Sequence, residues 1–144
     1  MVYVAYSSVH GHGVFADKDY AQDDIIELCP YLVTDDSDIG DKSILHDYVF
    51  QSPNEGSDEY LIPLGLAMIY NHSSEPNAEW EIHDDNNFGR IIALKSISKG
   101  EEIFHDYGKE YWESRDGESE GSQEEDKKSR KGFEESFQIT RKAS

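Results

Sequence analysis

A mostly β fold with little helix is predicted by the way apolar residues are grouped along the chain. The apolar runs are short, and clusters of Gly, Asn, Asp and Ser separate them at the spacing of β-hairpins. The apolar segment 64–70 is too short to predict a helix. A length of 144 residues suits one domain with one modest core.

The first half of the chain contains three predicted strands. Residues 2–8 and 13–16 lie on either side of a glycine-rich turn, and 25–33 is a near-continuous apolar run. Pro30 interrupts that run, which predicts an edge position or a bend because proline cannot donate to a β-ladder. Residues 35–42 are polar and acidic, and we expect a loop there.

The second half continues the same pattern. Residues 43–51 are predicted to be either a strand or a single helical turn, since periodicity cannot decide for so short a run. Residues 78–83 alternate as a strand, 88–97 form another, and 101–108 form a last strand that ends in a glycine.

The composition divides the chain into a foldable part and a tail. A single domain is predicted for residues 1–115. From Ser114 the residues are polar, charged or Gly, with no large apolar side chain before Phe133. We expect residues 116–144 to be a disordered charged tail, because such a segment buries too little surface to offset its ordering entropy. The cluster 127–131 is either a nuclear import signal or a solvated charge run.

The net charge of −18 is concentrated in the foldable part. Residues 1–113 contain 23 acidic and 6 basic residues, whereas residues 114–144 contain 8 acidic and 7 basic ones. A strongly negative domain repels nucleic acid and attracts basic partners. The simpler interpretation is that surplus acidic residues only keep a small protein soluble.

Other sequence features bear on location and metals. Cys29 is the only cysteine, so an internal disulfide and a cysteine-built zinc site are excluded. The start of the chain lacks the pattern of a secretory signal, and no apolar run approaches the roughly 20 residues that cross a bilayer. We therefore expect a soluble, intracellular protein. The six histidines show no metal-ligand spacing, and no metal site is expected.

Three segments carry residues suited to a binding site, although each has an ordinary alternative. Residues 11–16 are Gly-His-Gly-Val-Phe-Ala, a turn in which backbone can approach a ligand closely. Residues 71–78 are Asn-His-Ser-Ser-Glu-Pro-Asn-Ala, which offer directional donors and acceptors or merely form an Asn-capped turn. Residues 100–108 end in Asp-Tyr-Gly and are followed by Tyr111-Trp112. Tyr107 could present its phenol to a pocket or be a core residue.

Together, in this order and spacing, the three segments resemble the SET-domain lysine methyltransferases. The resemblance covers residues 3 to 115 and is greatest to the short viral and microbial members. It implies small curved β-sheets with a C-terminal pseudoknot, which would bring Asn71 and His72 beside Tyr107. It also implies S-adenosylmethionine as cofactor.

The resemblance further implies roles for individual residues. Tyr107 would be the catalytic tyrosine, and Tyr48 and His105 would contact the substrate lysine. The residues implied in cofactor binding are Gly11, His12, Gly13, Phe15, Asn71, His72, Tyr107 and Trp112. The family commonly has an aromatic residue at the position of His105, where it helps to set how many methyl groups are added. Their number therefore stays open here.

We therefore expect an enzyme that methylates lysine in a basic protein, such as a histone tail, with a nuclear location and a homodimer both open. The alternatives are a non-histone substrate, or a non-catalytic SET module that binds peptide or cofactor. Direct nucleic-acid binding through the tail is not expected, because its basic residues are balanced by acidic ones.

Overall fold

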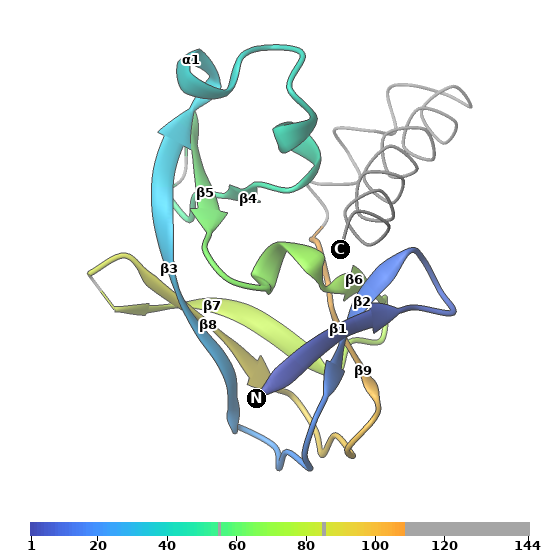
Figure 1. Ribbon diagram of the computed structural model, residues 1–144. Helices are drawn as coiled ribbons and strands as arrows, with labels where there is room; N and C mark the ends of the chain where they lie inside the picture. Colours follow the sequence, from blue (N-terminus) through green and yellow to red (C-terminus); the bar gives the residue numbers. More distant parts are fainter. Residues whose placement is uncertain (55, 85, 109–144) are drawn as a thin grey trace, which may run out of the picture.

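Two curved β-sheets form the framework of the computed structural model, which describes residues 1–54, 56–84 and 86–108 (Figure 1). The mostly β prediction is confirmed. The predicted tail and Trp112 lie outside the described residues. The four-stranded sheet has the order β1 (Val2–Tyr6), β2 (His12–Ala16), β9 (Glu102–His105), β6 (Asn71–His72). The five-stranded sheet has the order β4 (Phe50–Gln51), β5 (Glu59–Pro63), β3 (Ile25–Asp35), β8 (Phe88–Ala93), β7 (Ala78–Asp84).

The long strand β3 changes its pairing partner half-way along its length. It pairs with β8 from Ile25 to Pro30 and with β5 from Tyr31 to Asp35. In Figure 1, β3 connects β7 and β8 at one end with β4 and β5 at the other. Pro30 lies at the change of partner, where its missing N–H costs the ladder least. β3 is thus the middle strand of its sheet, with Pro30 at the junction between its two halves.

Short helical turns occupy the segments that the sequence left open. The segment 43–51 contains both predicted alternatives, a 3-10 turn η1 (Ile44–Asp47) followed by β4. The apolar segment 64–70 contains a second 3-10 turn, η2 (Ala67–Ile69). The expected acidic loop instead begins with a short helix, α1 (Asp36–Ile39), because the Asp35 carboxylate accepts the backbone N–H groups of the first turn. No helix among the described residues is long and apolar enough to cross a bilayer.

The core lies between the two sheets. Inward-facing residues alternate with more exposed ones along β8 and β9, as the period of a strand requires. Ile91, Ile97 and Ile103 are among the largest fully buried side chains. The buried cluster comprises Val14, Ala16, Tyr20, Ile26, Tyr70, Ala78, Ile91, Ala93, Ile97 and Ile103.

The parallel pairing of β6 with β9 brings together two segments that are distant in sequence. Asn71 pairs with Phe104 and His72 with His105. Just after β6, the Asn77 side chain extends this contact: its Nδ2 donates to the Glu102 carbonyl (2.9 Å), and its Oδ1 accepts the Phe104 N–H (2.8 Å). The amide of Asn77 thus satisfies backbone groups of β9 as a neighbouring strand would.

We predict that Asn77→Ala lowers the free energy of unfolding by about 2 kcal/mol, since two part-buried hydrogen bonds to β9 are lost. Urea denaturation measures this change. Asn54→Ala is the matched control, because Asn54 is exposed and should change stability by less than about 0.5 kcal/mol. Equal effects of the two substitutions would contradict the anchoring role of Asn77.

Candidate active site

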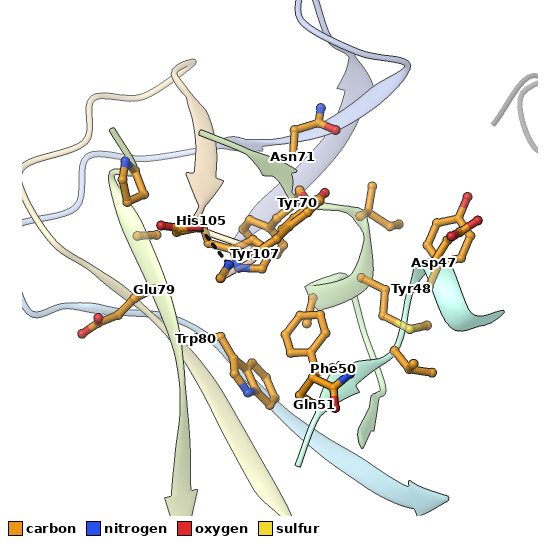
Figure 2. Close-up of a pocket in the computed structure, with 18 of the residues that line it drawn as sticks. Asp47, Tyr48, Phe50, Gln51, Tyr70, Asn71, Glu79, Trp80, His105 and Tyr107 are labelled. Atoms are coloured by element: carbon orange, nitrogen blue, oxygen red, sulfur yellow. Dashed lines mark hydrogen bonds between the residues drawn. The ribbon is translucent and has the colours of Figure 1, made fainter. Parts of the chain in front are cut away.

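A pocket of about 1090 Å³ lies where the three segments singled out by the sequence come together (Figure 2). Its walls come from the turn before β2, the segment from η1 to β4, η2 with β6, β7 and the end of β9. Six residues predicted to act at a site line it: Gly11, His12, Tyr48, Asn71, His105 and Tyr107. Gly13, Phe15 and His72 are outside the lining of the described pocket, and Trp112 is outside the described residues.

Tyr107 is held at the pocket by both of its polar ends. Its hydroxyl donates to the backbone carbonyl of Tyr70 (2.7 Å), and its N–H donates to Nδ1 of His72 (3.1 Å). Its ring centroid lies 4.9 Å from that of His105. The expected juxtaposition of residues 71–72 with Tyr107 is therefore present, and His72 contributes to it from behind the pocket wall.

The bond from Tyr107 also fixes the tautomer of His72. Because Nδ1 accepts the Tyr107 N–H, a neutral His72 ring has its proton on Nε2. The same Nδ1 lies 3.6 Å from Oδ1 of Asp106. His72 thus orders the backbone at Tyr107 by accepting its N–H.

Asn71 ties the glycine-rich turn to the body of the protein. Its Nδ2 donates to the backbone carbonyls of His10 (3.0 Å) and His12 (3.1 Å). The same group donates to Oε1 of Glu102 (2.8 Å). Gly13 makes room for this contact, since a Cβ atom there would lie 2.1 Å from Oε1 of Glu102. Asn71 and Gly13 thus shape the loop that forms one wall of the pocket.

Phe15 lies on the other side of β2 from the core. It stacks on Tyr3 with ring centroids 5.8 Å apart, and the two residues are direct cross-strand partners. Val14 and Ala16, its neighbours in sequence, are fully buried. The role of Phe15 in lining a cofactor stays a prediction, and the position of its side chain does not support this role.

His105 is a buried, neutral side chain in the pocket wall. Only 5% of its surface is exposed, and burial, followed by the nearby His72, lowers its pKa to about 4. The charge of Asp106 and a hydrogen bond with its backbone act in the opposite direction. Its Nε2 has no hydrogen-bond partner among the described residues. His105 therefore offers the pocket an uncharged imidazole.

Sequence reasoning missed the aromatic wall beside these residues. Figure 2 shows Trp80 and Phe50 near one another, below Tyr107 in this view. They meet edge to face with centroids 5.0 Å apart, and Phe50 lies 5.5 Å from His105. Gly89 allows Trp80 to pack, because a Cβ atom there would lie 1.8 Å from its ring. The alternation of apolar and polar residues along β7 predicts that one face of this strand points inward. It does not predict that this face forms a wall of the pocket.

The charged residues in the pocket wall are acidic. Asp47 and Asp106 line it, and Glu79 lines it with a carboxylate that points away from Trp80 in Figure 2. No lysine or arginine is found in the lining within the described part of the chain. Such a pocket favours a cationic or zwitterionic ligand over one that carries phosphates. Across residues 1–54, 56–84 and 86–108, no group of three His, Cys, Asp or Glu side chains is arranged to hold a metal ion.

Comparisons with known proteins agree on one family. The family model of the SET domain matches residues 11–108. A crystal structure of a Plasmodium falciparum candidate histone methyltransferase superimposes with a TM-score of 0.63 at 36% identity. That match covers 75% of this chain and 97% of the other.

Curated relatives carry the same domain within much longer proteins. Histone-lysine N-methyltransferase trr of Drosophila melanogaster is 32% identical over 114 residues, and human Histone-lysine N-methyltransferase 2D is 30% identical over 114 residues. An H3 lysine-36 specific histone-lysine N-methyltransferase of Debaryomyces hansenii is 28% identical over 116 residues. Each match covers 74% of this chain, but only 5%, 2% and 16% of the respective relatives.

We predict that acidification destabilises the fold through His105. Its pKa is lower in the folded state, about 4, than its ordinary value of 6.5, so the unfolded chain binds the extra proton between these limits. The stabilisation is complete above pH 6.5 and is lost as the pH falls to about 4, by about 3 kcal/mol.

Urea unfolding across this pH range measures the effect. His105→Phe should flatten the dependence of stability on pH, whereas the exposed control His83→Gln should keep the slope of the parent protein. An unchanged slope in His105→Phe would show that His105 is not the group that titrates.

Proposed function

Because the chain belongs to the SET-domain family, we propose that it is an S-adenosylmethionine-dependent methyltransferase that acts on lysine side chains of a basic protein, such as a histone. The observation that carries the proposal is the position of Tyr107. Tyr107 lines the pocket, its hydroxyl is oriented by the Tyr70 carbonyl, and its backbone is held by His72. Two segments distant in sequence thus meet at this one tyrosine.

The pocket suits the proposed cofactor. S-adenosylmethionine would supply a methyl group on a cationic sulfonium, and the acidic residues of the wall favour a cation. The turn with Gly11 and His12, held by the Asn71 amide, would contact the cofactor. Trp112 and Phe15 remain predicted contacts.

Tyr107 and the aromatic wall would prepare the amine of the substrate. A lysine has a pKa of about 10.4 in water and must become neutral before it attacks a methyl group. Phe50, Trp80 and neutral His105 form an aromatic part of the wall, and loss of water against this part disfavours the ammonium form. The Tyr107 hydroxyl would orient the amine for in-line attack, and positioning of this kind accounts for much of the rate acceleration.

The charge of the protein supports a basic substrate. Residues 1–113 carry a net charge of −17, and the charged side chains of the described pocket wall are acidic. Charge of one sign around a pocket raises the local concentration of an oppositely charged peptide. Histone tails are such peptides, and the relatives named as histone methyltransferases support this choice. A histone substrate implies that the protein reaches chromatin.

The test of catalysis uses mass spectrometry on core histones and a panel of basic peptides incubated with S-adenosylmethionine. The parent protein should add one or more methyl groups to lysine. Tyr107→Phe should lower turnover by at least about 100-fold, because it removes the hydroxyl that orients the amine. Its affinity for S-adenosylmethionine, measured by calorimetry, should stay the same.

The outcomes separate the proposal from its alternatives. Unchanged turnover in Tyr107→Phe would refute the catalytic role of Tyr107. Cofactor binding without methylation of any substrate would favour a non-catalytic SET module. Methylation confined to a basic protein other than a histone would support the reaction and change the substrate.

We also predict that salt weakens activity on basic substrates selectively. Two peptides with the same target lysine are compared, one flanked by Arg and Lys and the other by Ser and Gln. Raising the ionic strength should lower kcat/KM for the basic peptide, since salt screens the attraction of the acidic domain. The neutral peptide should be little affected. Parallel losses for both peptides would argue against electrostatic recognition.

A further inference from the structure

Glu27 lies on β3 and is outside the lining of the pocket. Its carboxylate makes two hydrogen bonds to one short segment. Oε1 accepts the backbone N–H of Leu66 (2.7 Å), and Oε2 accepts the hydroxyl of Tyr70 (2.9 Å). Leu66 and Tyr70 are the residues that flank η2 at its start and at its end. One side chain from a distant strand therefore holds both ends of the turn.

The turn η2 has no side-chain cap of its own. The N–H of its first flanking residue, Leu66, is satisfied by the Glu27 carboxylate from a distant strand. Gly65 makes room for the carboxylate: its φ is +115°, and a Cβ atom there would lie 2.5 Å from Oε1 of Glu27. The backbone before η2 is thus built around Glu27.

The second hydrogen bond of the Glu27 carboxylate is directional. Tyr70 is fully buried, and burial, together with the neighbouring Glu27, raises the pKa of its phenol. Tyr70 therefore keeps its proton and donates it to Glu27. Because the ring is also fixed by core packing, the Tyr70 backbone is restrained at both its side chain and its position after η2.

The carbonyl of Tyr70 is the group that accepts the Tyr107 hydroxyl (2.7 Å). A continuous path of hydrogen bonds and one residue of backbone thus runs from Glu27 through Tyr70 to Tyr107. We propose that Glu27 is a positioning residue for the methyl transfer, which fixes the Tyr107 hydroxyl through Tyr70. This role rests on the proposed function of Tyr107 and assigns no contact with substrate or cofactor to Glu27.

Tyr70→Phe tests the path most directly, because it removes the hydroxyl that meets Glu27 and leaves the carbonyl that meets Tyr107. We expect kcat to fall about 10- to 100-fold, with KM for peptide and the affinity for S-adenosylmethionine unchanged. Glu27→Gln is the second variant. A single amide oxygen cannot replace both carboxylate oxygens, so kcat should fall in the same direction.

Tyr20→Phe is the matched control. Tyr20 is another buried core tyrosine, and its hydroxyl donates to the Met1 carbonyl at a distance of 2.9 Å. Neither Tyr20 nor Met1 lines the pocket. The midpoint temperature of thermal unfolding should fall by similar amounts in Tyr20→Phe and Tyr70→Phe, since each variant loses one hydrogen bond from a buried hydroxyl. Only Tyr70→Phe should lose kcat. Equal kcat in both variants would show that Glu27 stabilises the fold and does not position Tyr107 for the reaction.

A readout independent of activity separates this inference from the proposed function. The nine tyrosines are labelled with ¹³C at Cζ, and the Tyr107 resonance is the one that Tyr107→Phe removes. In Tyr70→Phe and Glu27→Gln this resonance should shift or broaden, whereas Tyr20→Phe should leave it unmoved. An unmoved resonance in both test variants overturns the inference. Should no substrate be methylated, the proposed function fails, and should Tyr107→Phe retain full turnover, only the catalytic role of Tyr107 fails. In either case the resonance decides whether Glu27 positions Tyr107.

Discussion

The site depends on the parallel contact between β6 and β9. These strands contribute only two paired residues each, Asn71 with Phe104 and His72 with His105. So short a ladder is weak by itself, and side-chain amides on either end reinforce it. Asn77 bonds the backbone of β9, and Asn71 bonds the glycine-rich turn and Glu102. Without this contact, His72 and Tyr107 would not be held next to each other.

Polar clamps surround a pocket whose interior wall is aromatic. Glu102 accepts from Asn71 and from Ser7, and Glu27 accepts from Leu66 and Tyr70. Each carboxylate joins segments that are distant in sequence, and each requires a glycine beside it, as the close approaches at Gly13 and Gly65 demonstrate. At these two positions, glycine thus makes room for the approach of a side chain.

The short apolar runs predicted the fold class, since they are local signals, whereas the convergence of the motif segments was implied by the family resemblance. The sequence predicted Tyr107, Asn71 and His72 as neighbours through family resemblance. It did not predict the wall formed by Phe50 and Trp80, or the clamp formed by Glu27. Those contacts join β3, β4, β7 and η2, and side chains from four separate segments leave no joint pattern in a single sequence. The partner change of β3 at Pro30 was missed for the same reason, because pairing partners depend on the whole sheet.

The order of the strands has a consequence for how the protein is made. β9 lies between β2 and β6 in its sheet, yet it is the last strand of the described chain. Contacts between residues far apart in sequence are intrinsically slow to form. A growing chain that has not yet reached residue 102 contains the β1–β2 hairpin and every strand of the five-stranded sheet, but its first sheet has no centre. The pocket therefore cannot be assembled before the segment 102–108, which supplies β9 and Tyr107, has been synthesised.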